Sequence, residues 1–119
     1  MSRKGDGELE LEVLRVLWDA SESLQPAEVQ QRLTANLAYT SVATVLTRLT
    51  AKGLVSRELM GRHFVYEATL THDEWYAGRM MAILRDTSNH SSLLAGFVSK
   101  LSSRDRDALR SLLSEGDVE

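Results

Sequence analysis

Threonine and basic side chains recur at helical spacing between residues 39 and 52 of this 119-residue chain. At about 100° per residue, one face of a helix in this segment is centred on four small residues, with two further residues on its flanks. The four central residues are Thr40, Thr44, Thr47 and Ala51, and the flanking residues are Ala43 and Arg48. A solvated helix face normally carries Glu and Lys, whereas small hydroxyl residues allow close backbone approach and can hydrogen-bond phosphates or base edges. This face is therefore predicted either to contact DNA in the major groove or to pack against a partner protein.

The charge distribution favours the DNA interpretation. The chain has 14 basic and 17 acidic residues and a net charge of -3, yet the segment 29–57 contains no acidic residue. That segment carries +4, which leaves -7 on the rest of the chain, and its basic residues are Arg32, Arg48, Lys52 and Arg57. A carboxylate facing DNA would be repelled by phosphates spaced ~1.7 Å apart along the helix axis, so an acid-free segment suits a local anionic partner.

Three helices are expected to position these side chains. Apolar residues at spacings of 4, 3, 1 and 3 predict an amphipathic helix within 8–20, and Pro26 begins a second helix that continues to Leu37. The third helix, 39–52, ends at Gly53. The residues expected to face the core are Leu9, Val13, Val16, Leu17, Ala20, Val29, Leu33, Leu37, Val42, Val45, Leu46 and Leu49.

After Gly53 the hydrophobic period changes from helical to alternating. The stretches LVSREL and HFVYEA predict strands at 54–59 and 63–68, joined by a tight turn at Met60, Gly61 and Arg62. Arg57, Arg62 and His63 would lie on this hairpin, where its tip could touch a phosphate or the minor groove. Three helices followed by a hairpin are the elements of a winged helix-turn-helix domain.

The rest of the chain is predicted to be helical. Thr71 and Glu74 fit a capping box, the stretch TSNHSS interrupts the helix that follows, and Ser102 with Asp105 begins a last helix. The predicted fold is mainly α with a small β-hairpin wing, a winged helix-turn-helix followed by a helical dimerisation tail. Its expected divisions are a flexible leader at 1–7, a DNA-binding domain at 8–70 and a dimerisation domain at 71–119.

The tail is expected to form a homodimer. Three short helices with one apolar stripe each cannot bury those stripes alone, and exchange with a second subunit would cover them. The residues expected in the shared core are Trp75, Tyr76, Met80, Ile83, Leu84, Leu93, Leu94, Phe97, Val98, Leu101, Leu109 and Leu113. The alternative is that some of them pack back on the wing within one chain.

Enzymatic and metal-dependent functions are not indicated. The chain has no cysteine, and His63, His72 and His90 lack the i, i+4 spacing of a helical metal site, so surface or capping roles are expected. Asp105 and Asp107 point in different directions on a helix, and no phosphate loop or nucleophile elbow occurs. No metal or cofactor is expected. A set of methionines is expected to fill cores rather than line a ligand pocket, and these are Met60, Met80 and Met81.

The sequence also favours a location inside the cell. No apolar run approaches the ~20 residues that span a bilayer, and the stretch MSRKGDGE has no apolar segment after its basic residues. A cytoplasmic protein without membrane association is therefore expected.

Three stretches resemble the penicillinase and methicillin-resistance repressors, whose relatives include copper-responsive repressors. They are VLWDA in the first helix, AYTSVATVLTRLTAKGLV through the third helix and GRHFVYEA in the hairpin, and the resemblance extends more loosely through the tail. It implies a dimeric repressor on a promoter with dyad symmetry, dimerised by its helical tail. The positions it implies to face DNA are Thr40, Ser41, Ala43, Thr44 and Arg48, and at Ala43 a longer side chain would contact more of a base edge.

The resemblance also implies a way to end repression. In penicillinase-type relatives, a signal from a membrane sensor leads to proteolytic cutting of the tail just before a phenylalanine, which corresponds here to the Gly96-Phe97 bond. A sensor-linked protease is thus an implied partner. The relatives at this position carry a polar residue in place of Gly96. Copper-responsive relatives carry a C-terminal cysteine cluster, and a chain without cysteine cannot form that copper-thiolate switch.

The expected function is a homodimeric transcriptional repressor that binds double-stranded operator DNA. The residues expected at the DNA are Thr40, Ser41, Ala43, Thr44, Thr47, Arg48, Lys52, Arg57, Arg62 and His63. Two alternatives remain at this point: a winged-helix regulator released by a small molecule in its dimer interface, and a winged helix that serves only as a protein interaction module.

Overall fold

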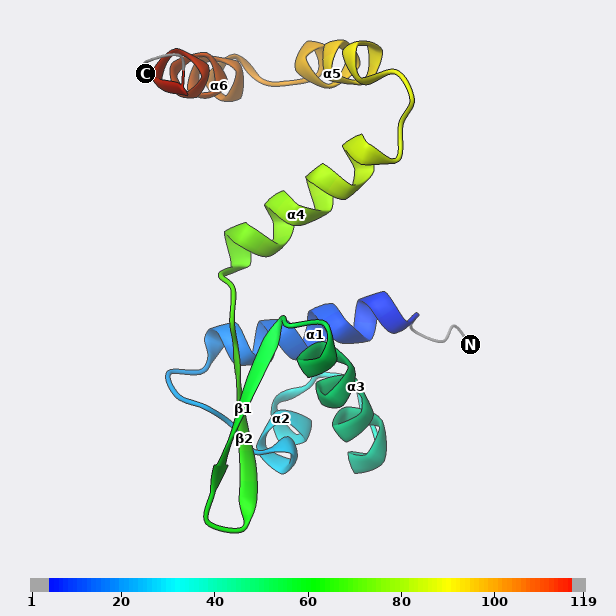
Figure 1. Cartoon of the computed structure of the whole chain (residues 1–119), viewed down its shortest axis with the longest axis vertical. Helices are drawn as coiled ribbons and strands as arrows, with labels where there is room; N and C mark the ends of the chain where they lie inside the picture. Colours follow the sequence, from blue (N-terminus) through cyan, green and yellow to red (C-terminus); the bar gives the residue numbers. More distant parts are fainter. Residues whose placement is uncertain (1–4, 117–119) are drawn as a thin grey trace. The chain divides into compact units, whose positions relative to one another are not determined.

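The computed structural model describes residues 5–116, and within them the chain forms a three-helix and hairpin arrangement followed by three further helices (Figure 1). The helices are α1 (Asp6–Asp19), α2 (Pro26–Arg32), α3 (Tyr39–Ala51), α4 (His72–Arg85), α5 (His90–Ser99) and α6 (Ser103–Gly116), and the strands are β1 (Val55–Met60) and β2 (His63–Ala68). The chain divides into two compact units between Tyr76 and Ala77. The first unit has the predicted winged helix-turn-helix architecture, and the mainly α fold class is confirmed.

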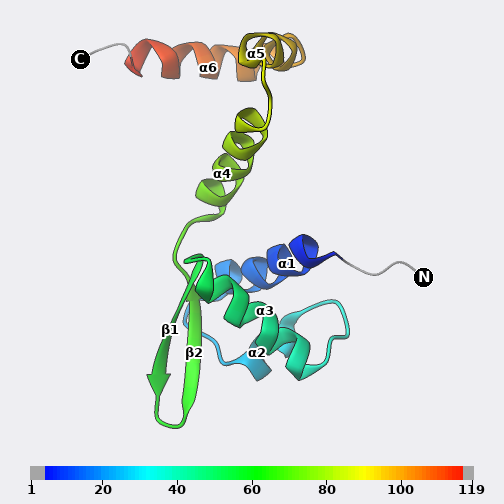
Figure 2. The same cartoon turned by 45° about the vertical axis from the view of Figure 1, so that its right-hand side comes forward.

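The core of the first unit lies where α1, α2 and α3 meet the base of the hairpin, an arrangement visible in Figures 1 and 2. Its buried residues are Val13, Leu14, Leu17, Leu24, Val29, Val42, Val45, Leu46, Leu49, Val55 and Tyr66. The predicted apolar stripes of α1 and α3 are confirmed. Leu14 and Leu24 were not predicted, yet both are completely buried. Because α1 contacts α2, α3 and β2, its apolar stripe is wider than one row of residues.

Helix α2 ends earlier than predicted. Leu33 is its C-cap with an extended backbone conformation, and the predicted continuation to Leu37 is wrong. Both leucines still pack against the core, but from a connecting segment. Gln30 Nε2 donates to the backbone oxygen of Leu37 at 2.9 Å, which stabilises this connection in place of a further helical turn.

Two glycines with left-handed backbone conformations shape the hairpin. Gly53 (φ 79°) follows α3, as predicted, and Gly61 (φ 66°) lies in the two-residue turn between Met60 and His63. Positive φ at the first turn residue alone corresponds to a type II′ turn, which matches the twist of the strands. Strand β1 begins and ends one residue later than predicted. Met60 is therefore the last residue of the strand and not part of the turn.

A third short segment extends the hairpin. Leu24 exchanges backbone hydrogen bonds of 2.9 and 2.7 Å with Tyr66, so it lies beside β2 on the edge opposite β1. Thr69 then donates its backbone N–H to the Leu54 oxygen at 2.9 Å and its hydroxyl to the Gly53 oxygen at 2.7 Å. These contacts fix the ends of the hairpin to α1–α3 and leave its turn to project away from them (Figure 2).

The starts of α4 and α6 follow the predicted capping chemistry, and the start of α5 has a cap that was not predicted. The Glu74 N–H donates to Thr71 Oγ1 at 3.1 Å and the Thr71 N–H to Glu74 Oε1 at 2.8 Å, which confirms the capping box of α4. At the start of α6, the Asp105 N–H donates to Ser102 Oγ at 3.1 Å. The cap of α5 was not predicted: Asn89 Oδ1 accepts from Ser92 N–H at 3.0 Å. Helix α1 begins at Asp6, inside the segment predicted to be a flexible leader, whose first four residues are outside the described part.

In the described part of the chain, the helices are too short and too polar to cross a membrane.

Candidate nucleic-acid interface

The outer face of α3 has the composition that the sequence predicted. Thr40, Ser41, Thr44 and Thr47 are exposed, whereas Ala43 and Arg48 are partly exposed on its flanks. The first turn of α3 contains no acidic residue, unlike that of α2, which contains Glu28. The positive end of the α3 dipole is thus not neutralised within its own first turn, and it favours an approaching phosphate.

A shallow open hollow of about 400 Å³ runs along this face. It is lined by Ala43, Thr44, Thr47, Arg48 and Ala51. Ala51 was predicted to lie on this face of the helix, but it was not among the residues expected to contact DNA. The lining combines four small side chains with one arginine, so another molecule can approach the helix backbone closely.

Lys52 has a partner within the chain. Its Nζ lies 2.9 and 2.8 Å from the two carboxylate oxygens of Glu10 on α1. The Glu10 side chain is only 12% exposed, whereas that of Lys52 is 50% exposed. The pair joins the C-terminal end of α3 to α1, a contact that the segment-by-segment charge pattern could not indicate.

The wing carries the remaining basic residues that were expected at DNA. Arg62 lies in the hairpin turn and His63 begins β2, and both are exposed. Arg57 on β1 lies with its guanidinium carbon 4.2 Å from the ring centroid of Phe64 on β2. Stacking of this kind orders an arginine without neutralising its charge. The register of the two strands explains this contact. Phe64 is opposite Leu59, so Arg57, two residues before Leu59, is the diagonal neighbour of Phe64.

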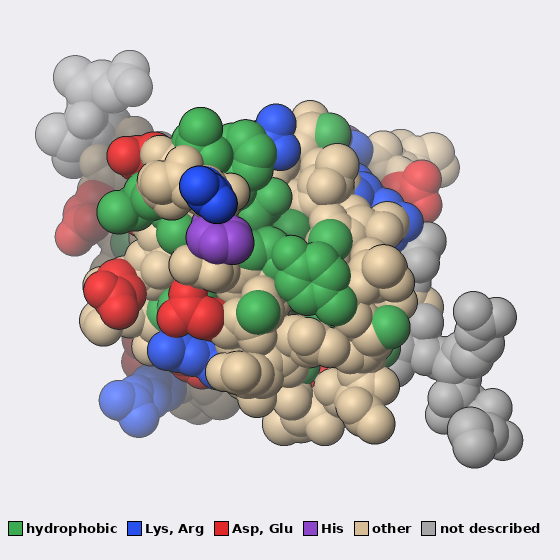
Figure 3. All heavy atoms as spheres, turned by 90° about the horizontal axis from the view of Figure 1, so that it is seen from below, with side chains coloured by type: hydrophobic (Ala, Val, Ile, Leu, Met, Phe, Trp, Pro, Cys, Tyr) green, Lys and Arg blue, Asp and Glu red, His purple; other side chains and the backbone are tan. Residues whose placement is uncertain are grey.

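Figure 3 shows the end of the first unit toward which the hairpin turn points. Hydrophobic and uncharged side chains cover the middle of this face, a histidine lies beside a basic side chain, and acidic side chains lie near the histidine as well as toward the edges. The exposed apolar residues of the wing include Leu59, Met60 and Phe64. The prediction that Met60 fills the core is therefore wrong, because Met60 is at the strand end next to the turn.

Comparison with known proteins identifies the family. The family model described as penicillinase repressor matches residues 6–115. The chain belongs to the penicillinase repressor family. It is 36% identical over 114 residues to "Transcriptional regulator BlaI" of Mycobacterium tuberculosis strain CDC 1551 / Oshkosh, covering 92% of this chain and 83% of that protein. The same values apply to the protein of that name in M. tuberculosis strain H37Rv.

Two solved structures share part of the backbone arrangement of this chain. The ferric uptake regulator Fur of Helicobacter pylori has a TM-score of 0.49 at 18% identity, covering 71% of this chain and 73% of that chain. MepR of Staphylococcus aureus, a transcription regulator of the multidrug efflux pump MepA, has a TM-score of 0.46 at 16% identity, covering 90% and 73%.

Membership in the family makes this chain a DNA-binding transcriptional repressor and not an enzyme. In the described residues of the repressor, no group of three or more His, Cys, Asp and Glu side chains is placed to hold a metal ion. His72 and His90 are the first residues of α4 and α5, and His63 is the first residue of β2.

An aromatic cluster joins the start of α4 to α1 in the repressor. The His72 ring centroid lies 5.0 Å from that of Trp18 and 4.7 Å from that of Tyr76, both in edge-to-face geometry. Trp75 contacts Tyr76 and Trp18 in the same manner, at 4.9 and 6.4 Å. Trp18 Nε1 donates to the Leu70 oxygen at 2.9 Å, so indole, backbone and ring contacts together hold the connection into α4.

This cluster gives two of the predicted dimer residues a role within one chain. Trp75 packs against the core of the first unit, and the Tyr76 hydroxyl accepts from Arg15 Nη2 at 3.1 Å. The first unit accordingly extends to Tyr76 rather than ending at residue 70. The sequence placed Trp75 and Tyr76 in the shared core of the dimer, and nothing in it indicated that Trp18 would be their neighbour.

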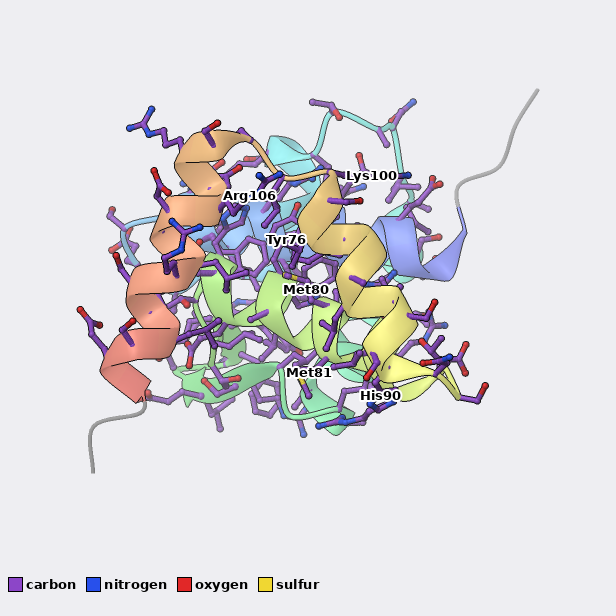
Figure 4. All side chains as sticks on the ribbon, turned by 90° about the horizontal axis from the view of Figure 1, so that it is seen from above. Tyr76, Met80, Met81, His90, Lys100 and Arg106 are labelled. Carbon is purple, nitrogen blue, oxygen red and sulfur yellow. The ribbon has the colours of Figure 1, made fainter. Side chains whose placement is uncertain are left out.

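The remaining predicted dimer residues are accessible. Within the described residues of α4, α5 and α6 no side chain is buried. The large apolar residues exposed there include Tyr76, Met80, Met81, Ile83, Leu94, Phe97, Leu112 and Leu113, and those of intermediate exposure include Leu84, Leu93, Val98, Leu101 and Leu109. In Figure 4, Tyr76 and Met81 project from opposite sides of α4, and Met80 lies between them. Apolar exposure on this scale is typical of a surface that another chain covers.

Proposed function

We propose that this repressor binds a dyad-symmetric operator as a homodimer, with one α3 helix and one wing from each subunit contacting each half-site. The observation that carries the proposal is the acid-free outer face of α3, which combines exposed small residues with the partly exposed Arg48. A face of this composition fits the major groove, and Arg57 with Arg62 adds positive charge on the wing. Such a protein would act in the cytoplasm, where the promoter is.

The proposal of a homodimer rests on the tail. A helix of 10 or 14 residues with an apolar stripe is stable mainly through the burial of that stripe, and the tail helices leave theirs exposed in one chain. A second copy of the tail offers complementary apolar stripes and a two-fold axis. That axis would in turn match a dyad-symmetric operator, because a two-fold protein binds two related half-sites.

We further propose that cleavage of the Gly96-Phe97 bond by a sensor-linked protease ends repression. This bond lies inside α5, and the Gly96 oxygen accepts a hydrogen bond from Ser99 Oγ at 2.7 Å. A protease requires an extended substrate, so α5 must open locally before it can be cut. Glycine within a helix favours that opening, since it lowers helix stability by roughly 1 kcal/mol relative to alanine.

The dimer is tested by sedimentation of the full chain and of two variants on α5. Leu94→Asp places a charge on an exposed apolar residue and is expected to give monomers with weak operator binding. Ser92→Asp changes an exposed polar residue two positions away, on the other side of the helix, and is expected to leave the dimer intact. A dimeric Leu94→Asp protein with unchanged operator affinity would remove this part of α5 from the proposed interface.

A further inference from the structure

The two exposed threonines in the middle of α3 have their hydroxyl protons engaged by the helix itself. Thr44 Oγ1 donates to the Thr40 oxygen at 2.8 Å, and Thr47 Oγ1 donates to the Ala43 oxygen at 2.9 Å. A threonine hydroxyl has one proton to donate. While these bonds persist, neither side chain can donate a hydrogen bond to a base edge or to a phosphate oxygen. This differs from the donor role that the sequence suggested for the threonines.

The methyl groups and the acceptor lone pairs of the oxygens are the parts of these side chains that remain available to another molecule. Because the Cβ atom is tetrahedral, a threonine whose oxygen is directed back to the carbonyl of the preceding turn carries its methyl in a different direction. Thr44 and Thr47 line the hollow on α3 together with Ala43 and Ala51, whose side chains are themselves methyl groups. The hollow thus offers methyl contacts together with one basic side chain, Arg48.

One group in the major groove matches such a surface. Guanine and adenine present only hydrogen-bonding atoms to the groove and cytosine presents an amino group, whereas thymine presents a C5-methyl. We propose that Thr44 and Thr47 determine sequence preference through their methyl groups, by contact with thymine C5-methyls. The inference rests on the proposed function, because it assumes that α3 lies in the major groove, and it names the chemistry by which that helix distinguishes sequences.

The magnitude follows from the size of the contact. Burying one methyl group is worth about fourfold in affinity, so removing one methyl from either partner should weaken binding by about that factor. Removing both the threonine methyl and the thymine methyl that it contacts should weaken binding no more than removing one of them, because the same contact is lost in each case. This non-additivity distinguishes direct contact from two independent effects.

The experiment uses the full chain and the duplex that it selects from a random pool. Deoxyuridine replaces each thymine in turn, which deletes only the C5-methyl, and affinities are measured for wild type, Thr44→Ser, Thr47→Ser, Thr44→Val and Thr47→Val. For at least one thymine, wild type and both valine variants should prefer thymine over uracil by about fourfold, whereas the serine variant at the contacting position should show no preference. Thr50→Ser is the matched control, because Thr50 makes the same type of bond to the Leu46 oxygen at 2.8 Å but lies outside the hollow. Its thymine preference should equal that of wild type.

Three results would overturn the inference. Wild type could be indifferent to uracil at every thymine, or the serine variants could keep the thymine preference. The valine variants could also lose sequence preference while the serine variants retain it, which would mean that the hydroxyls leave their carbonyls and bond to bases. A pool that yields no preferred duplex would overturn the proposed function as well, whereas a preferred duplex without methyl dependence would leave that function standing.

Discussion

Removal of the Lys52 side chain should cost stability without changing the salt dependence of DNA binding. Lys52 and Arg48 are one helical turn apart near the end of α3, and both were expected to contact phosphate. In the structure Lys52 Nζ is within 2.9 Å of both Glu10 oxygens, and that carboxylate is largely shielded from solvent. A lysine whose charge is paired in this way contributes little to phosphate binding, so Lys52→Ala should leave the salt slope at its wild-type value.

The magnitudes separate the two roles. A single phosphate contact contributes about 0.9 to the slope of log K against log salt, which corresponds to about 3.5-fold in affinity between about 50 and about 200 mM salt. Lys52→Ala should lose none of this, whereas it should destabilise the first unit by up to about 1 kcal/mol, as a partly exposed ion pair does. That loss corresponds to about 4–8 °C in Tm for a domain of this size.

The assay measures DNA affinity at several salt concentrations and thermal unfolding for Lys52→Ala, Glu10→Gln and the double variant. Glu10→Gln should show a similar loss in Tm, and the double variant should lose little more than either single variant, because the pair is broken once. A slope reduced by about 0.9 in Lys52→Ala would show instead that Lys52 leaves Glu10 to bind phosphate.

Other perturbations test other parts of the account. Arg48→Ala should weaken binding to all DNA sequences and lower the salt slope by about 0.9, and an unchanged slope would exclude a phosphate contact. Leu14→Ala, at a completely buried residue, should lower the free energy of unfolding by about 2–5 kcal/mol in denaturant titrations, and a smaller loss would indicate a core that collapses around the missing atoms. Gly96→Ala has space for the added methyl group, so it should stabilise α5 and slow the appearance of a fragment that begins at Phe97 in extracts of antibiotic-treated cells. No such fragment even from wild type would exclude the proposed cleavage.

The periodic features of this protein could be predicted from sequence because local chemistry decides them. The apolar residues of α3 recur at helical spacing, Gly53 supplies the left-handed conformation after it, and Thr71 and Glu74 cap α4 by contacts within four residues. The fold followed from the order of these elements. The predicted DNA-facing residues of α3 are exposed or partly exposed on one surface, since the face opposite an apolar stripe is fixed by the helical period.

The features that sequence analysis missed depend on contacts between distant segments. Helix α2 stops at Arg32 because the following leucines reach the core from a connection, which no local signal required. Glu10 pairs with Lys52 across 42 positions, and Trp18 contacts His72 across a still larger separation. The direction of a threonine hydroxyl depends on the side-chain rotamer. The spacing of Thr44 and Thr47 therefore predicted that both lie on the outer face of α3, but not whether the hydroxyl or the methyl group points outward.

A mobility shift of the purified full chain on the DNA upstream of its own reading frame tests operator binding by a homodimer most directly. Binding would be followed from about 50 to about 200 mM salt in the presence of competitor DNA, with the mass of the complex determined in solution. A homodimeric repressor should give a discrete complex of two chains on one duplex that survives competitor at the higher salt. Diffuse binding that disappears over this salt range, or a complex with one chain per duplex, would contradict a homodimeric repressor acting at this site.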